Sequence, residues 1–96
     1  MADHALPMPG IIIETLAGQC PVEAEGTIDG EPFYFRSRGA HWTLGIGGEV
    51  IGDPRWQYRE PYGTWPDAGY ITEEQARRFI AEGAARYRAA AEVADA

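Results

Sequence analysis

Hydrophobic and polar residues alternate between residues 21 and 46 with a period of two, which predicts β-strands. Val22, Ala24, Gly26 and Ile28 share one side of the first run, and Glu23, Glu25 and Thr27 share the other. Two more alternating runs follow at 33–38 and 41–46. Asp29-Gly30 and Gly39-Ala40 separate the runs and are typical of two-residue hairpin turns. The pattern predicts a three-stranded antiparallel meander over about residues 20–48.

The two turns fix the register of the meander. They place Phe35 opposite both Ala24 and Leu44, so that one face is apolar. They also place Glu23 opposite Arg36, a favourable cross-strand pair of opposite charges on the other face. We therefore expect one face of the sheet to be covered and the other to be exposed.

A helix is predicted over about residues 73–92. It begins at a capping box, Thr72-Glu73-Glu74-Gln75. Apolar or small residues then recur at spacings of three and four, at positions 76, 79, 80, 83 and 87. Gly83 is unfavourable inside a helix by roughly 1 kcal/mol relative to Ala, so we expect it where the helix lies closest to the sheet.

These elements predict an α+β fold: a three- to four-stranded antiparallel β-meander with one C-terminal α-helix packed on one face. Residues 1–10 are expected to form a flexible tail, and residues 11–96 a single domain. The stretch 11–16 is either an edge strand or a short turn of helix.

Residues 49–70 contain five of the eleven aromatic residues, broken up by three prolines and three glycines. Alternation at 55–60 allows a short fourth strand. Two interpretations of this segment are compatible. The aromatic rings either complete the core, for example with Trp65 buried, or form a recognition surface, for example with Trp56 or Tyr62 exposed.

The chain has a formal net charge of −7, and the excess of acids is uneven. Residues 1–70 contain ten acids and four arginines, or −6. Direct binding of nucleic acid needs a basic stripe, which this charge balance disfavours. A sheet that reads DNA is also disfavoured, because Glu23 and Glu25 share the exposed face with only Arg36 and Arg38. No apolar run is long enough for a membrane span, and the N-terminus lacks a signal-peptide pattern, so we expect a cytoplasmic protein.

The sequence shows no arrangement typical of catalysis, and we expect a non-enzyme without cofactor or metal. The single cysteine, Cys20, shares parity with the core face and is expected to be buried, whereas His41 falls on the exposed face. Glu23 and Glu25 share a face without a pocket, which favours a solvated strand over paired acid–base groups.

In size and acid balance the chain resembles the phage-encoded inhibitors of bacterial defence, anti-CRISPR proteins among them. The resemblance extends over the whole chain but includes no motif, so it assigns no residue. It implies a small acidic protein that occupies a basic, nucleic-acid-binding surface of a partner. The predicted contact residues are Glu23, Glu25, Asp29, Glu31, Asp53, Trp56, Tyr58, Glu60 and Tyr62. The alternatives are a homodimer formed through a sheet edge or the exposed face, and a small-molecule-binding domain.

Overall fold

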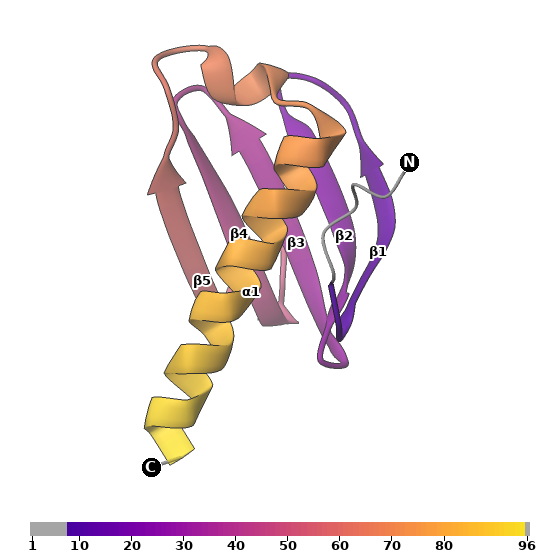
Figure 1. The fold of residues 1–96 in the computed structure, drawn as a ribbon, viewed down its shortest axis with the longest axis vertical. Coiled ribbons are helices and arrows are strands. Elements are labelled where there is room, and N and C mark those ends of the chain that lie inside the picture. Colours follow the sequence, from indigo (N-terminus) through magenta and orange to yellow (C-terminus); the bar gives the residue numbers. More distant parts are fainter. Residues whose placement is uncertain (1–7, 96) are drawn as a thin grey trace.

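The computed structural model describes residues 8–95, which form one antiparallel sheet with a long helix across one face (Figure 1). The strands are β1 (Ile11–Ala17), β2 (Val22–Ile28), β3 (Glu31–Arg38), β4 (His41–Glu49) and β5 (Asp53–Pro61). A short 3-10 helix, η1 (Asp67–Tyr70), precedes the helix α1 (Glu73–Asp95). The predicted α+β class and the C-terminal helix are confirmed. The sheet has five strands in chain order, however, where three or four were expected.

The predicted register of the central strands is confirmed. Phe35 pairs with Ala24 on β2 and with Leu44 on β4, and Glu23 pairs with Arg36. Asp29 and Gly30 both have positive φ, 52° and 83°, as their two-residue turn requires. The face with Phe35 is the buried one, and we call the opposite face, which contains Glu23, the outer face.

The two additional strands lie at the edges of the sheet. Residues 11–16 form a strand rather than a turn of helix, and β1 has a bulge between Ile13 and Thr15. Because the bulge adds one residue, Ile13 and Leu16 both pack against the core although their spacing is odd. The second edge strand, β5, is longer than the alternation at 55–60 indicated and pairs with β4 along its length.

The helix α1 begins at the predicted capping box. The Thr72 hydroxyl accepts a hydrogen bond from Gln75 N (3.0 Å), and Gln75 Oε1 accepts one from Thr72 N (2.8 Å). Its buried positions, Ala76, Ile80 and Ala84, face the sheet. The helix continues to Asp95, beyond the predicted end at about residue 92.

Gly83 lies at a close approach of α1 to the sheet, in agreement with the prediction. A Cβ atom at this position would be 2.5 Å from Cδ2 of the fully buried Leu44. The absence of a side chain at Gly83 therefore allows the helix to rest directly on β4.

The turns β1–β2 and β3–β4 lie at one end of the sheet, which we call the apex and which is uppermost in Figure 1. The connection from β5 to α1 crosses this end. The buried Ser37 hydroxyl donates a hydrogen bond to the Ala68 carbonyl (2.6 Å), and Ala68 N donates to the Gly39 carbonyl (2.9 Å). These bonds fix the connection to β3 and to the β3–β4 turn.

The opposite end of the sheet holds the N-terminal segment. Asp29 N donates a hydrogen bond to the Gly10 carbonyl (2.8 Å), and Met8 packs against the core. The tail was predicted over residues 1–10, and residues 1–7 of it lie outside the described part of the chain.

Candidate binding surface

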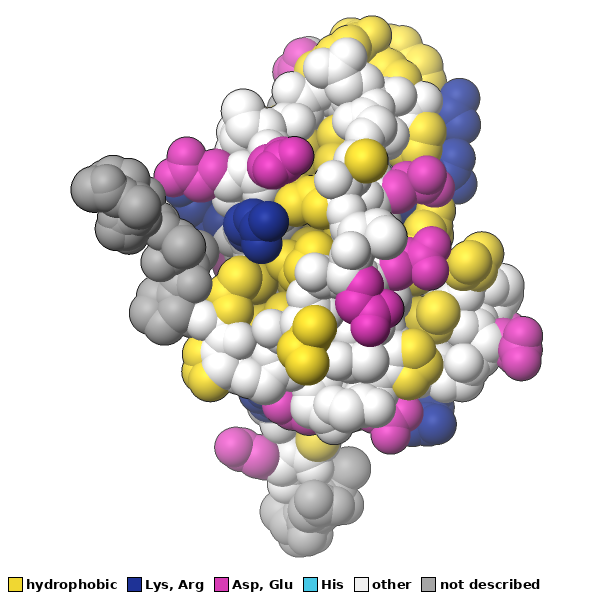
Figure 2. All heavy atoms as spheres, turned by 90° about the vertical axis from the view of Figure 1, so that its right-hand side faces the viewer, with side chains coloured by type: hydrophobic (Ala, Val, Ile, Leu, Met, Phe, Trp, Pro, Cys, Tyr) yellow, Lys and Arg dark blue, Asp and Glu magenta, His cyan; other side chains and the backbone are white. Residues whose placement is uncertain are grey.

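Three exposed carboxylates lie close together on the first two strands. Glu23 and Glu25 are on the outer face of β2, and Glu14 is the bulge residue of β1, next to Thr15, which pairs with Glu25. We call these three residues the acidic strip. Figure 2 shows acidic side chains along this side of the molecule, with hydrophobic ones between them. No described arginine lies within ion-pairing distance of the strip.

Tyr34 is hydrogen-bonded to the acidic strip. Its hydroxyl donates a hydrogen bond to Glu23, and it pairs with Glu25 across the strands. Burial, the hydrogen bond and the negative charge of Glu23 raise the pKa of Tyr34 to about 12. The Tyr34 hydroxyl therefore stays protonated and available as a donor to Glu23.

The other half of the outer face is basic. Arg36, Thr43 and Arg59 occupy one row across β3, β4 and β5, and Arg38 and His41 occupy the next. Arg59 Nη2 lies 3.4 Å from His41 Nδ1. Burial, followed by the positive charges of Arg59 and Arg36, lowers the pKa of His41. Because β5 joins the sheet, this face has one more arginine than the sequence pattern indicated.

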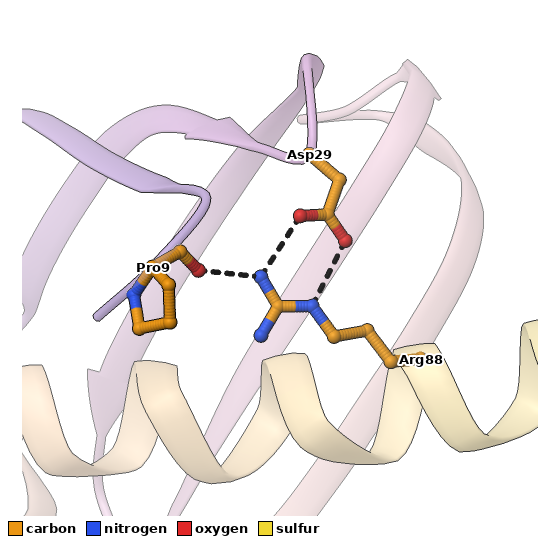
Figure 3. Close-up of polar contacts among 3 residues, drawn as sticks. All are labelled: Pro9, Asp29 and Arg88. Atoms are coloured by element: carbon orange, nitrogen blue, oxygen red, sulfur yellow. Dashed lines mark hydrogen bonds and ion pairs between the residues drawn. The ribbon is translucent and has the colours of Figure 1, made fainter. Parts of the chain in front are cut away.

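The predicted contact residues near the β2–β3 and β4–β5 turns form ion pairs or lie apart from the acidic strip. Asp29 accepts two hydrogen bonds from Arg88, at 2.9 Å each, and Arg88 also donates to the Pro9 carbonyl at 2.8 Å (Figure 3). This bidentate pair joins α1, the β2–β3 turn and the N-terminal segment, and it lowers the pKa of Asp29. Glu31 pairs with Arg55 at 3.3 Å. Asp53 begins β5 opposite the exposed Glu49.

The predicted aromatic contacts lie on the helix side of the sheet. Trp56 packs edge-on against Tyr87 of α1, and the Arg86 guanidinium lies 4.7 Å from the centre of the Tyr58 ring. Tyr58 also donates a hydrogen bond to Glu60, which raises the pKa of Tyr58. These side chains are half-buried on the face opposite Glu23 and Glu25. The structure therefore does not bring the predicted residues together as one surface.

Tyr62 completes the core as well. Its ring meets Phe79 edge-on, and its hydroxyl accepts a hydrogen bond from Gln75 Nε2 (2.9 Å). For Trp56, Tyr58 and Tyr62 the core-covering interpretation holds. Trp56 and Tyr62, which the recognition interpretation placed on the surface, are partly buried because residues of α1 pack against both.

The exposed aromatic residues of the segment are two that the sequence analysis did not place on the surface. Trp65 is 72% exposed and Tyr70 is 57% exposed, both at the apex. The expectation of a buried Trp65 is therefore wrong. Its ring lies against the backbone of Gly39, at the rim of the sheet and beyond the end of the core. Trp65 lies beyond the end of β5 at Pro61, so the alternation of that strand gives no information on whether the Trp65 ring is exposed.

Cys20 also lies at the apex and is exposed, so the expectation of a buried thiol is wrong. Its φ of 45° places it in the turn before β2, where strand parity no longer applies. Tyr70 is a neighbour of Cys20, and the Cys20 thiol raises the pKa of Tyr70. Among the described side chains, no group of three acidic, histidine or cysteine residues is arranged to hold a metal ion.

Comparisons of the chain with protein-family models, curated proteins and solved structures found no match. Within the described residues, no helix has the length and apolar character needed to cross a membrane.

Proposed function

We propose that this chain is a non-catalytic binding protein that docks on a basic surface of a partner protein through its acidic strip. The observation that supports the proposal is the grouping of Glu14, Glu23 and Glu25 on the side of the sheet that α1 leaves open. Exposed carboxylates attract a basic surface electrostatically, and this attraction weakens as the salt concentration rises.

Inhibition is the functional consequence that we infer. A basic protein surface that binds nucleic acid would be blocked when this chain occupies it, as the resemblance to anti-CRISPR proteins implies. The shape of the surface supports a protein partner, because an antiparallel sheet face offers a broad area of contact, without need for a pocket.

The test uses the tagged chain to capture proteins from its host, at low and at high salt, with two charge-reversed variants. The first is Glu14→Lys with Glu25→Lys, which leaves the Glu23 contacts intact. The matched control is Glu82→Lys with Glu92→Lys, the same change of charge on the exposed side of α1. We expect a basic protein to be captured by the wild type and the control, and lost from the first variant and at high salt. Equal capture by all three proteins would refute the proposal.

Self-association is a second candidate, favoured by the opposite charges on the two halves of the outer face. A two-fold axis parallel to the strands would bring the acidic strip of one copy toward the arginines of the other. Sedimentation velocity at micromolar concentration should then show a dimer that dissociates at high salt. A monomer under both conditions would exclude this candidate.

A further inference from the structure

Four side chains with hydrogen-bond donors lie together on the outer face, toward the apex. Arg36 of β3 and Arg59 of β5 occupy one row with Thr43 of β4 between them. His41 lies two residues before Thr43 and therefore on the same side of β4. This face is the far side of the sheet in Figure 1, which α1 leaves open. We call Arg36, His41, Thr43 and Arg59 the basic cluster.

The charged groups of the basic cluster converge on His41. Arg59 Nη2 lies 3.4 Å from His41 Nδ1. Burial and then the positive charges of Arg59 and Arg36 lower the pKa of His41, so both guanidinium groups act on the ring, from the strands on either side of β4. Neighbouring strands are about 5 Å apart, and two long side chains that flank Thr43 can both reach a ligand above its hydroxyl.

Within the described part of the chain, no carboxylate neutralises the basic cluster. Glu23 is opposite Arg36 in the register, but its carboxylate accepts the hydrogen bond of Tyr34 and forms no ion pair with Arg36. The ion pairs between described residues are formed by other arginines. The cluster therefore keeps its positive charge on an exposed face.

The polar atoms of the cluster are suited to an oxyanion. A guanidinium group has only donors, in a planar fork that matches the oxygens of a phosphate group. Because Nδ1 of His41 faces the Arg59 guanidinium, which cannot accept a hydrogen bond, the ring proton belongs on Nε2, which is then a further donor. The Thr43 hydroxyl can donate as well. Three kinds of donor thus surround one position on the face.

We propose that the basic cluster binds a phosphate group, held by the forks of Arg36 and Arg59 with His41 and Thr43 as further donors. The inference goes beyond the proposed function, because the acidic strip takes no part in it. The chain is acidic overall, but Glu23 lies two strands away from Thr43, about 10 Å. Physiological salt screens exposed charges over about 8 Å, so the acidic strip does not prevent an anion from binding at the cluster.

The experiment is an NMR titration of the intact chain at pH 7 with sodium phosphate, compared with sodium chloride at equal ionic strength. We expect phosphate, and not chloride, to shift the signals of the His41 ring and the Thr43 amide. A bound phosphate stabilises the imidazolium form and should raise the pKa of His41. Arg36→Gln and Arg59→Gln should each weaken phosphate binding by about threefold to fivefold. Arg78→Gln, on the exposed side of α1, is the matched control and should leave it unchanged.

Adenosine monophosphate distinguishes two sources of the phosphate group. Trp65 lies on the Gly39 turn, which joins β3 to β4 beside the cluster. If the nucleotide binds more tightly than phosphate and Trp65→Ala removes only that difference, the source is a nucleotide. If both bind equally, the phosphate group alone is recognised. Either result supports the site.

Three results would overturn the inference. Equal shifts with phosphate and chloride would mean that salt only screens the arginines. Binding of an oligoglutamate peptide without binding of phosphate would assign the cluster to an acidic segment of a protein. If the His41 signals shift with protein concentration alone, and Glu14→Lys with Glu25→Lys abolishes that shift, the cluster is occupied by a second copy. The same charge-reversed variant should still bind phosphate, so failure of the proposed function and failure of this inference are separate results.

Discussion

The close approach of α1 to the sheet at Gly83 makes a quantitative prediction. In an exposed helix, Gly→Ala stabilises by about 1 kcal/mol. At Gly83 the new methyl group would lie 2.5 Å from Cδ2 of Leu44 and 3.4 Å from its Cβ, so Leu44 or the helix must move. Leu44 is fully buried, and overpacking of a well-packed core typically costs about 1–3 kcal/mol. The net effect of Gly83→Ala is a loss of about 0–2 kcal/mol in the free energy of unfolding.

The assay is urea unfolding followed by circular dichroism, supported by thermal melts. A loss of 1 kcal/mol corresponds to a decrease of roughly 4–8 °C in Tm for a domain of this size. The control is Ala85→Gly at an exposed helix position, which should lose about 1 kcal/mol from propensity alone. Glycine would then be the more stable residue at position 83 and alanine the more stable residue at position 85.

A double-mutant cycle tests the mechanism. Leu44→Val removes one methylene group from the contact and should cost about 1 kcal/mol in the wild-type background. In the Gly83→Ala background it should cost less, because it also makes room for the new methyl group. If Gly83→Ala stabilises the protein by about 1 kcal/mol, or if the two changes are additive, the close contact does not determine the residue at position 83.

Two further predictions concern titrating groups. Arg88 lowers the pKa of Asp29 below its ordinary value of 3.8, so the pair stabilises the fold above that pH and loses its effect as the pH falls through the folded-state pKa. Asp29→Asn, which tolerates the same positive φ, should lose up to about 1 kcal/mol at pH 7, and urea unfolding should show this difference shrinking in acid. An unchanged difference would contradict the ion pair. Arg59→Gln should raise the pKa of His41 in NMR titrations, without restoring it fully because burial is the largest cause. Arg77→Gln should leave it unchanged, and equal titration curves for all three proteins would contradict the assignment.

The sequence by itself determined the central part of the fold. Turn residues and a period of two defined the register of β2, β3 and β4, and a capping box defined the start of α1. These signals are local, because each depends on residues a few positions apart. The acids of β2 could likewise be assigned to the face opposite the core.

Tertiary structure decided the edges of the sheet and the exposure of the aromatic residues. The bulge of β1 changes strand parity, so alternation alone could not show that Leu16 joins the core. Trp56 and Trp65 belong to one aromatic segment, yet α1 packs against the first, whereas the second lies beyond the sheet on the backbone of Gly39. Which ring is buried depends on where α1 comes to lie, because the contact of Trp56 is with Tyr87, far along the chain. Local periodicity contains no information about where α1 lies relative to these rings, because that position is determined by tertiary packing.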